Sequence, residues 1–195
     1  MLQLLLASAS LRRADLLRTA GLDFEIKPTN VDESLRANEL PEGYVKRLAE
    51  AKATAVVEFA GNRPVVGADT VVVVNEQILG KPTNAGDASR MLHLLSGRHH
   101  EVVTGVTVIG LPLVGQERLR LTNFTTTRVK MAALSESEIE WYISTGEPLG
   151  KAGAYAIQGL ASRFITHIEG SYSNVVGLPI FLLYSMLKKV ISVTT

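Results

Sequence analysis

The chain has 195 residues, of which 46% are hydrophobic and 20% are charged, and its formal net charge is +1. These values predict a globular protein with a substantial core, in which residues 1–195 form one domain or two closely packed lobes. They leave no basic excess for binding a nucleic-acid backbone. The chain has no cysteine, which excludes disulfides, thiolate metal sites and a cysteine nucleophile and fits a cytoplasmic protein.

The N-terminal part of the chain alternates between strand and helix patterns. In chain order it predicts a buried strand, a helix, a strand with a polar loop, a second helix and a valine-rich strand, at residues 2–7, 11–20, 24–35, 41–61 and 63–74. Gly21 ends the first helix pattern, while Pro41 and Gly61 mark the start and the end of the second. The valine-rich strand is almost continuously apolar, so we expect it to be buried on both faces.

The same alternation continues through the rest of the chain. It predicts a short strand and turn, a helix, two long paired strands, a helix, a glycine-containing loop, a strand and a last helix, at residues 78–82, 83–97, 100–110, 119–132, 135–146, 147–159, 163–170 and from about 179. A turn around Pro112 and Gly115 joins the paired strands, and Ser135 with Glu138 forms a capping box. The order of elements predicts an α/β protein with a mixed sheet flanked by helices.

Neither apolar end of the chain predicts a membrane anchor. The N-terminal run "LQLLLASAS" lacks a basic flank and is too short for a signal segment. The run "VVGLPIFLLYSML" contains Gly177 and Pro179 and is shorter than a membrane-spanning helix. We therefore expect no membrane partner.

Two arginines stand in the first turn of the first predicted helix, directly after a turn that contains Ser8 and Ser10. The helix dipole disfavours positive charge there by about 0.3 to 1 kcal/mol for each residue. Free amides at a helix N-terminus bind phosphate, and a guanidinium matches phosphate oxygens in a bidentate manner. Arg12 and Arg13 therefore indicate a polyphosphate ligand whose negative charge reverses the penalty.

A carboxylate interrupts the valine-rich strand. Asp69 would suffer heavy desolvation among valines unless it met a cation, a metal or several hydrogen-bond donors. The residues alone leave three interpretations open: a structural aspartate at a bend beside Gly67, a metal ligand, or a general base. Glu33 lies in a polar loop, where acidic residues are usually only solvated, and Asp32 beside it leaves the local assignment ambiguous.

Three further polar residues stand in notable contexts. Lys81 lies between a glycine and a proline, in a stiff turn that would hold an ammonium in place, although a solvated turn lysine looks the same. Lys52 lies among alanines in a helix, where a solvated lysine is the ordinary interpretation. Gln158 ends the glycine-containing loop, which would let the backbone approach a ligand closely and also fits a plain flexible loop.

Several common nucleotide and hydrolase motifs are absent. The chain has no G-x-x-x-x-G-K-[ST] phosphate loop, no G-x-G-x-x-G after a strand and no G-x-S-x-G elbow. His99 and His100 are adjacent and would face opposite sides of a strand. The sequence thus argues against the usual nucleotide-binding folds and against a histidine-based zinc site.

Motifs spread over about residues 4–187 resemble the Maf family of nucleotide pyrophosphatases. They are, in chain order, "LASASLRR", "VDES", "VVGADTVVV", "ILGKP", "GEPLGKAGAYAIQG" and "GSYSNVVGLP". The resemblance implies an elongated α/β fold related to the inosine triphosphate pyrophosphatases, with two lobes around a cleft, commonly as a homodimer. It also implies hydrolysis of nucleoside triphosphates to monophosphate and pyrophosphate with a divalent metal such as Mg²⁺, Mn²⁺ or Co²⁺.

The resemblance also implies roles for individual residues. The set expected to hold phosphates is Ser8, Ser10 and Arg13, and the set expected to line the reaction centre is Glu33, Lys52, Asp69 and Lys81. Asp69 is the expected base, and it would share the metal with Glu33. Which of the two carboxylates mainly holds the metal stays open.

Arg12, Thr70 and Gln158 are similar to the residues of the family branch that hydrolyses dTTP and UTP. Leu11 replaces the proline usual in the family, which affects the start of the first helix, and Gly150 replaces a common acidic residue. Two other functions remain open: a nucleotide-sensing regulator of cell division or septum formation, and a pyrophosphatase for modified purine triphosphates. The retained carboxylates and lysines favour the enzyme.

Overall fold

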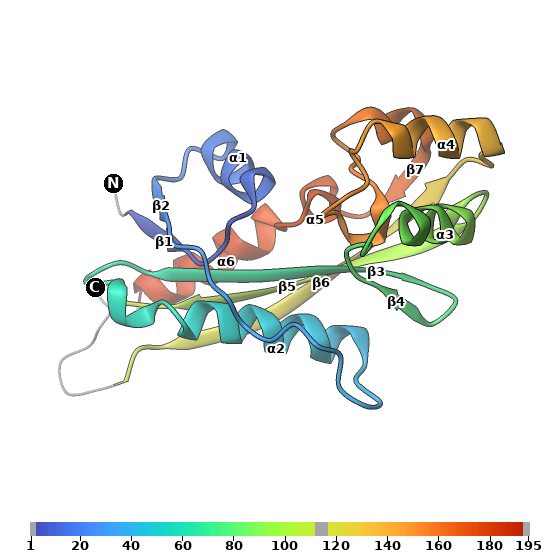
Figure 1. Cartoon of the computed structure of the whole chain (residues 1–195). Coiled ribbons are helices and arrows are strands. Elements are labelled where there is room, and N and C mark those ends of the chain that lie inside the picture. Colours follow the sequence, from blue (N-terminus) through green and yellow to red (C-terminus); the bar gives the residue numbers. More distant parts are fainter. Residues whose placement is uncertain (1–2, 112–116, 193–195) are drawn as a thin grey trace. The chain divides into compact units, whose positions relative to one another are not determined.

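The computed structural model describes residues 3–111 and 117–192 of the chain (Figure 1). Within that part, the chain divides into two compact units. Unit 1 comprises the described residues within 1–69, 104–125 and 177–195, and unit 2 comprises residues 70–103 and 126–176.

A mixed sheet of seven strands is present among the described residues, in the order β2-β1-β3-β5-β6-β7, with β4 paired to β3. The strands are β1 (Leu4–Leu6), β2 (Phe24–Ile26), β3 (Val65–Val74), β4 (Gln77–Leu79), β5 (His99–Ile109), β6 (Arg120–Met131) and β7 (Ile165–Glu169). The strand β1 pairs in parallel with β2 and β3, whereas the pairs β3–β4 and β6–β7 are antiparallel. The predicted α/β class with a mixed sheet is confirmed.

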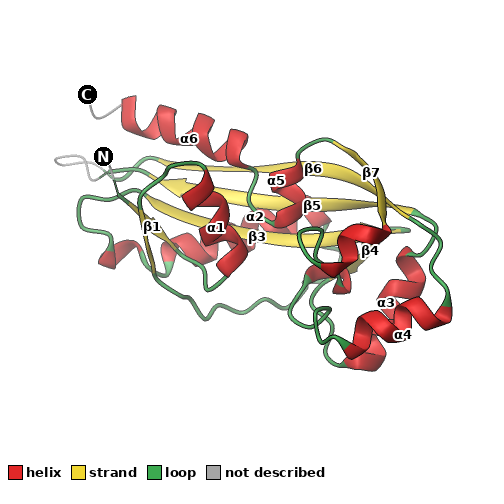
Figure 2. Ribbon diagram, turned by 90° about the horizontal axis from the view of Figure 1, so that it is seen from above, coloured by secondary structure: helices red, strands yellow, loops and turns green. Residues whose placement is uncertain are grey.

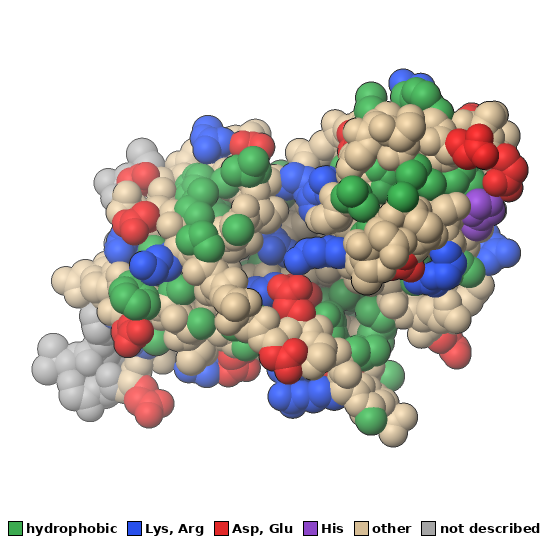
Figure 3. All heavy atoms as spheres, in the orientation of Figure 1, with side chains coloured by type: hydrophobic (Ala, Val, Ile, Leu, Met, Phe, Trp, Pro, Cys, Tyr) green, Lys and Arg blue, Asp and Glu red, His purple; other side chains and the backbone are tan. Residues whose placement is uncertain are grey.

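Helices separate many of these strands along the chain, and Figure 2 draws the helices in red and the strands in yellow. They are α1 (Leu11–Thr19), α2 (Pro41–Thr54), α3 (Ala85–Leu95), α4 (Glu136–Ser144), α5 (Tyr172–Val176) and α6 (Ile180–Ser192). Three short 3₁₀ segments accompany them among the described residues: η1 (Val57–Phe59), η2 (Ala152–Ala154) and η3 (Leu160–Phe164). None of the described helices is both long and apolar enough to cross a membrane. Acidic and basic side chains both occur across the face drawn in Figure 3.

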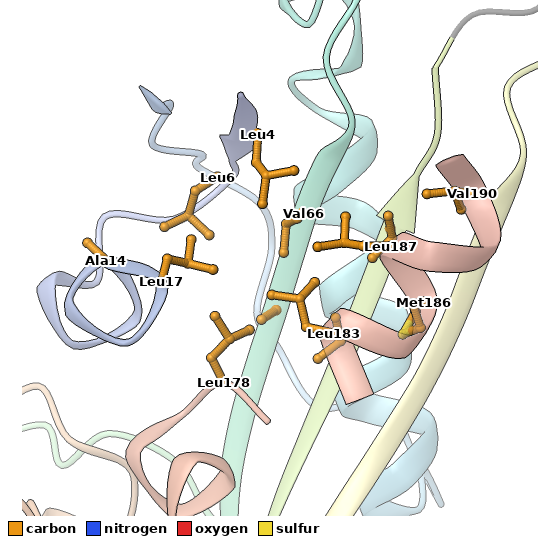
Figure 4. Packing of buried hydrophobic residues seen from close by; sticks show 13 residues of the cluster. Leu4, Leu6, Ala14, Leu17, Val66, Leu178, Leu183, Met186, Leu187 and Val190 are labelled. Atoms are coloured by element: carbon orange, nitrogen blue, oxygen red, sulfur yellow. The ribbon is translucent and has the colours of Figure 1, made fainter. Parts of the chain in front are cut away.

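The core of unit 1 follows from the alternation of side chains along β1 and β3. One face of the sheet carries Leu4, Leu6 and Val66, which pack with Leu17 of α1 and Leu183 of α6 (Figure 4). The opposite face carries the odd-numbered residues, and Leu5 and Val65 pack there with Ala53 and Val56 of the α2 region. Helices therefore cover both faces of this part of the sheet, and register decides which helix each strand residue meets.

Two glycines let α2 lie unusually close to the sheet. A Cβ atom added at Gly67 of β3 would lie 2.7 Å from the Ala53 nitrogen and closer still to the carbonyl oxygen of Ala49. A Cβ atom added at Gly105 of β5 would lie 2.8 Å from the Lys46 nitrogen. Because no side chain separates the backbones, the helix rests directly on the two strands.

Unit 2 contains α3 and α4, each with a side-chain cap at its N-terminus. The Asn84 side chain accepts from the Asp87 nitrogen, and Ser135 with Glu138 forms the predicted capping box. His93 Nε2 lies 2.9 Å from Glu136, which links the two helices. The antiparallel pair β3–β4 turns through Asn75 and Glu76, whose positive φ angles suit a tight hairpin turn.

The structure corrects the bounds of two predicted elements and adds short helical segments, among them η3 and α5. The first strand is Leu4–Leu6 rather than 2–7, and the helix predicted over 41–61 ends at Thr54, where Val56 turns its side chain into the core. The segment η3 precedes β7, and α5 lies before the last helix; both escaped prediction because they are short. The turn predicted at Pro112 and Gly115 lies outside the described residues.

Candidate functional site

Ser8 lies in the turn between β1 and α1, and its side chain contacts both this turn and the helix. Its hydroxyl oxygen accepts hydrogen bonds from the Ser10 nitrogen at 3.2 Å and from Arg13 Nη1 at 3.2 Å. Ser8 is buried, and Ser10 is the N-cap residue of α1 in an extended conformation, with no side-chain cap bond. The predicted phosphate-binding residues Ser8, Ser10 and Arg13 are thus brought together at the N-terminus of a helix, where backbone amides attract anions.

Arg13 is held from two sides. Besides its bond to Ser8, its Nε donates to the carbonyl oxygen of Gly177 at 2.7 Å. Burial lowers the pKa of Arg13 from its ordinary value; the charges of Asp69 and Glu33 oppose that shift, and Arg12 adds to it. Since a guanidinium stays protonated in proteins, Arg13 supplies a fixed positive charge near these two carboxylates.

Lys52 of α2 joins the two carboxylates that the sequence singled out. Its Nζ lies 2.6 Å from Glu33 Oε1 and 2.6 Å from Asp69 Oδ1. The side chains of Lys52 and Asp69 are 9% and 10% exposed, while that of Glu33 is 40% exposed. Asp69 thus meets a buried cation, one of the partners that a carboxylate among valines needs, and this pairing offsets its desolvation.

The register of β3 explains why these groups meet. Asp69 has the same parity as Val65 and Gly67, so it lies on the face covered by α2. Lys52 belongs to the buried stripe of that helix, one turn after Leu48. The close approach permitted by Gly67 brings the helix within reach, and the ammonium meets the carboxylate. Its place in the buried stripe of α2 indicates a charge partner for Lys52, which its alanine neighbours alone do not.

Two residues of α2 that the sequence did not single out hold the loop that carries Glu33. The Tyr44 hydroxyl donates to the carbonyl oxygen of Glu33 at 2.7 Å. Arg47 donates to the carbonyl oxygen of Ser34 at 3.0 Å and pairs with both carboxylate oxygens of Glu39, at 2.6 and 2.7 Å. Burial, followed by the charges of Asp69 and Glu33, raises the pKa of Tyr44 to about 12, so its hydroxyl stays a donor at neutral pH.

Glu33 and Asp69 offer carboxylate oxygens that could hold a metal ion. Among the residues that the structure describes, no three His, Cys, Asp or Glu side chains are grouped as ligands. Two carboxylates within 2.6 Å of one ammonium nevertheless provide clustered oxygen donors. Mg²⁺ is commonly held by one or two carboxylates together with substrate phosphates, so this pair fits such a cation.

The remaining predicted site residues belong to unit 2, apart from Arg12, which is half-buried in α1. Thr70 follows Asp69 on β3 and is half-buried, and Lys81 is exposed directly after β4. The Gly153 nitrogen donates to the carbonyl oxygen of Gly80 at 3.0 Å, so the glycine-containing loop lies against the turn of Lys81. Gln158 is exposed, in the turn before η3.

Unit 1 therefore gathers six of the predicted residues into one site, namely Ser8, Ser10, Arg13, Glu33, Lys52 and Asp69. The sequence missed Tyr44, Arg47 and Gly177. Gly177 adopts a φ of 122°, a backbone conformation that favours glycine, and this conformation presents its carbonyl oxygen to Arg13. Gly177 stands in the motif "GSYSNVVGLP", but the sequence alone predicts no role for it.

A protein from Koribacter versatilis (strain Ellin345) named dTTP/UTP pyrophosphatase is 48% identical over 186 residues, covering 95% of this chain and 93% of that protein. A protein of the same name from Geotalea uraniireducens (strain Rf4) is 51% identical over 177 residues, covering 91% of this chain and 89% of that protein. The motifs thus belong to a similarity that extends along almost the whole chain.

Among solved structures, the Ham1 protein of Staphylococcus aureus matches with a TM-score of 0.42 at 14% identity, covering 65% of this chain and 71% of that one. The family model described as Maf-like protein matches residues 3–190. This match spans both units and all six residues gathered in unit 1. The chain belongs to the Maf-like protein family.

Proposed function

We propose that this chain is a nucleoside triphosphate pyrophosphatase that hydrolyses dTTP and UTP to the nucleoside monophosphate and pyrophosphate. The observation that carries the proposal is the buried Lys52 ammonium, 2.6 Å from both Glu33 and Asp69. Phosphoryl transfer needs a positioned water and positive charge around the phosphates more than it needs covalent chemistry. This cluster offers carboxylates that can orient a water and an ammonium that supplies the charge. The choice of dTTP and UTP as substrates is supported by the relatives named dTTP/UTP pyrophosphatase.

In this mechanism Asp69 orients the attacking water and accepts its proton. Its bond to Lys52 Nζ, at 2.6 Å, keeps the carboxylate from turning freely. The Lys52 ammonium also offsets negative charge that develops on the phosphates. Ser8, Ser10 and Arg13 hold phosphate oxygens with their hydroxyl, amide and guanidinium donors, and Lys81 contributes a further positive charge.

Glu33 and Asp69 are the residues that would hold a divalent cation, whether Mg²⁺, Mn²⁺ or Co²⁺. When bound, such a cation supplies Lewis-acid polarisation of a phosphate oxygen. Glu33 is well suited to this because its side chain is the more exposed of the pair. Tyr44 and Arg47 support Glu33 through its own backbone and that of Ser34.

Arg12, Thr70 and Gln158 are assigned to base selectivity. Their polar groups suit the carbonyl and imide edge of a pyrimidine, and a site built from hydrogen-bonding groups disfavours bases that leave those groups unpaired. This assignment supports dTTP and UTP over ATP and GTP.

The proposal extends to the setting of the enzyme, which we place in the cytoplasm as a homodimer without a nucleic-acid partner. The formal net charge of +1 leaves little basic excess to hold a polyanionic backbone, and the absence of cysteine suits a reducing compartment. The homodimer rests on the family resemblance. Light scattering of the purified chain measures its mass directly.

A nucleotide panel tests the activity. With Mg²⁺ or Mn²⁺, dTTP and UTP should give monophosphate and pyrophosphate, and their catalytic efficiency should exceed that of ATP and GTP by at least about tenfold, roughly 1.4 kcal/mol. Release of orthophosphate and a nucleoside diphosphate would show that another bond is cleaved, and preference for a methylated guanosine triphosphate would overturn the proposed substrates. EDTA should abolish turnover, whereas full activity in EDTA contradicts the role of the metal.

A further inference from the structure

Gln158 needs a rigid backbone if it is to distinguish one base from another. It is exposed, within a turn in which the Gly159 nitrogen donates to the carbonyl oxygen of Ala156 at 3.0 Å. A glutamine on a mobile loop would lose side-chain and backbone entropy each time it engaged a base. Whatever holds this turn therefore influences selectivity.

One carboxylate, that of Glu147, holds the segment directly after Gln158. Its Oε2 accepts from the Leu160 nitrogen at 3.0 Å, and its Oε1 accepts from the Ala161 nitrogen at 3.3 Å. The Tyr142 hydroxyl donates to Oε1 of the same carboxylate at 2.9 Å. Three donors thus converge on Glu147, and an ionised carboxylate suits them because it carries acceptors alone.

Tyr142 holds the segment directly before Gln158. Its hydroxyl oxygen accepts from the Ala156 nitrogen at 3.2 Å while it donates to Glu147. The Tyr142 side chain is fully buried on α4, and burial followed by the bond to Glu147 raises its pKa. Glu147 and Tyr142 together therefore fix the turn on both sides of Gln158.

Gly159 shows how closely the carboxylate lies against this turn. A Cβ atom added there would lie 2.6 Å from Glu147 Cδ, and the two carboxylate oxygens would be similarly close or closer. Any larger residue at position 159 would displace Glu147 from its three donors. The glycine that follows Gln158 is thus required by packing against Glu147.

We propose that Glu147 and Tyr142 are positioning residues that set the base selectivity of the enzyme by fixing the backbone around Gln158. The inference rests on the proposed function, because that function gives Gln158 its role. It assigns a purpose to Glu147 in the motif "GEPLGKAGAYAIQG", far along the chain from the reacting groups of unit 1.

The test compares Glu147→Gln with Glu140→Gln, a matched change at an exposed position on α4. In Glu147→Gln the ratio of kcat/KM for dTTP to kcat/KM for ATP should fall about three- to tenfold, mainly through a higher KM for dTTP. In Glu140→Gln this ratio should stay at its wild-type value. In a Gln158→Ala background the same change at Glu147 should leave the ratio as it is. An unchanged ratio, or an equal fall in both backgrounds, overturns the inference.

Hydrogen exchange gives a second readout that does not depend on activity. Backbone amides of residues 156–161 should exchange faster in Glu147→Gln than in the wild-type chain, and unchanged exchange there refutes the anchoring. Gly159→Ala leaves Glu147 in the sequence but displaces its carboxylate. It should reproduce both the lower dTTP/ATP ratio and the faster exchange, and it replaces Glu147→Gln as the test if that variant does not fold. If the wild-type enzyme showed no preference for dTTP, the proposed function would be contradicted. If residues 156–161 exchanged as slowly in the variants as in the wild-type chain, the inference about Glu147 and Tyr142 would be contradicted.

Discussion

Gly67→Ala tests whether the close approach of α2 to β3 builds the reaction centre. The new methyl group would lie 2.7 Å from the Ala53 nitrogen and closer to the Ala49 carbonyl oxygen, so α2 must retreat by roughly 1 Å to restore ordinary contacts. Overpacking of this kind costs about 1 to 3 kcal/mol. For a chain of this size, that cost lowers Tm by about 2 to 12 °C.

Turnover should fall further than stability alone explains, because α2 carries Lys52. A misplacement of about 1 Å in a catalytic group can cost about a hundredfold in rate. The assays are thermal unfolding and pyrophosphate release with dTTP, performed well below Tm. Gly43→Ala is the matched control: it lies on the same helix, its Cβ would lie 3.9 Å from Glu39 Cγ, and it should keep activity. A Gly67→Ala chain with wild-type Tm and turnover would refute the reasoning.

Three further outcomes are expected. Asp69→Asn keeps an oxygen acceptor for Lys52 and should fold normally but lose at least about a hundredfold in kcat; near-normal turnover would return Asp69 to a structural role. Tyr44→Phe removes the bond to the Glu33 carbonyl oxygen and should raise the Mg²⁺ concentration needed for half activity, so superimposable Mg²⁺ titrations would argue against it. Burial, with a lesser contribution from the charge of His99, lowers the pKa of His100 to about 4. Between about pH 6.5 and 4 the unfolded chain therefore binds a proton that the folded chain does not. As the pH decreases through that window, the free energy of unfolding decreases by up to about 1.4 kcal/mol per pH unit. His100→Gln should flatten this fall in Tm between pH 7 and 5, and parallel profiles would count against the assignment.

The parts of the fold that sequence predicts well are those determined by local interactions. The capping box of Ser135 and Glu138 and the turn residues around α3 act within a few positions, so both helices were found. The end of α2 was wrong because it depends on Val56, whose side chain packs against residues of β1 and β3 far away in sequence. Tertiary packing overrides local helix preference at such a position.

The candidate site likewise contains residues that the sequence indicates and residues that only the structure identifies. Asp69 was conspicuous because a carboxylate among valines needs a partner, but its partner Lys52 looked like an ordinary helical lysine. Tyr44 carried no signal, since its bond to the backbone of Glu33 depends only on where the loop passes. Residue types thus indicated phosphate chemistry, while the groups that position them required the three-dimensional structure.

The bond between Arg13 and the Gly177 carbonyl oxygen joins residues 164 positions apart. Contacts of such long sequence separation close a large loop, so they carry a high entropic cost and tend to form late in folding. We therefore expect the guanidinium that we propose to bind phosphate to reach its final geometry late in folding, when Gly177 is in place.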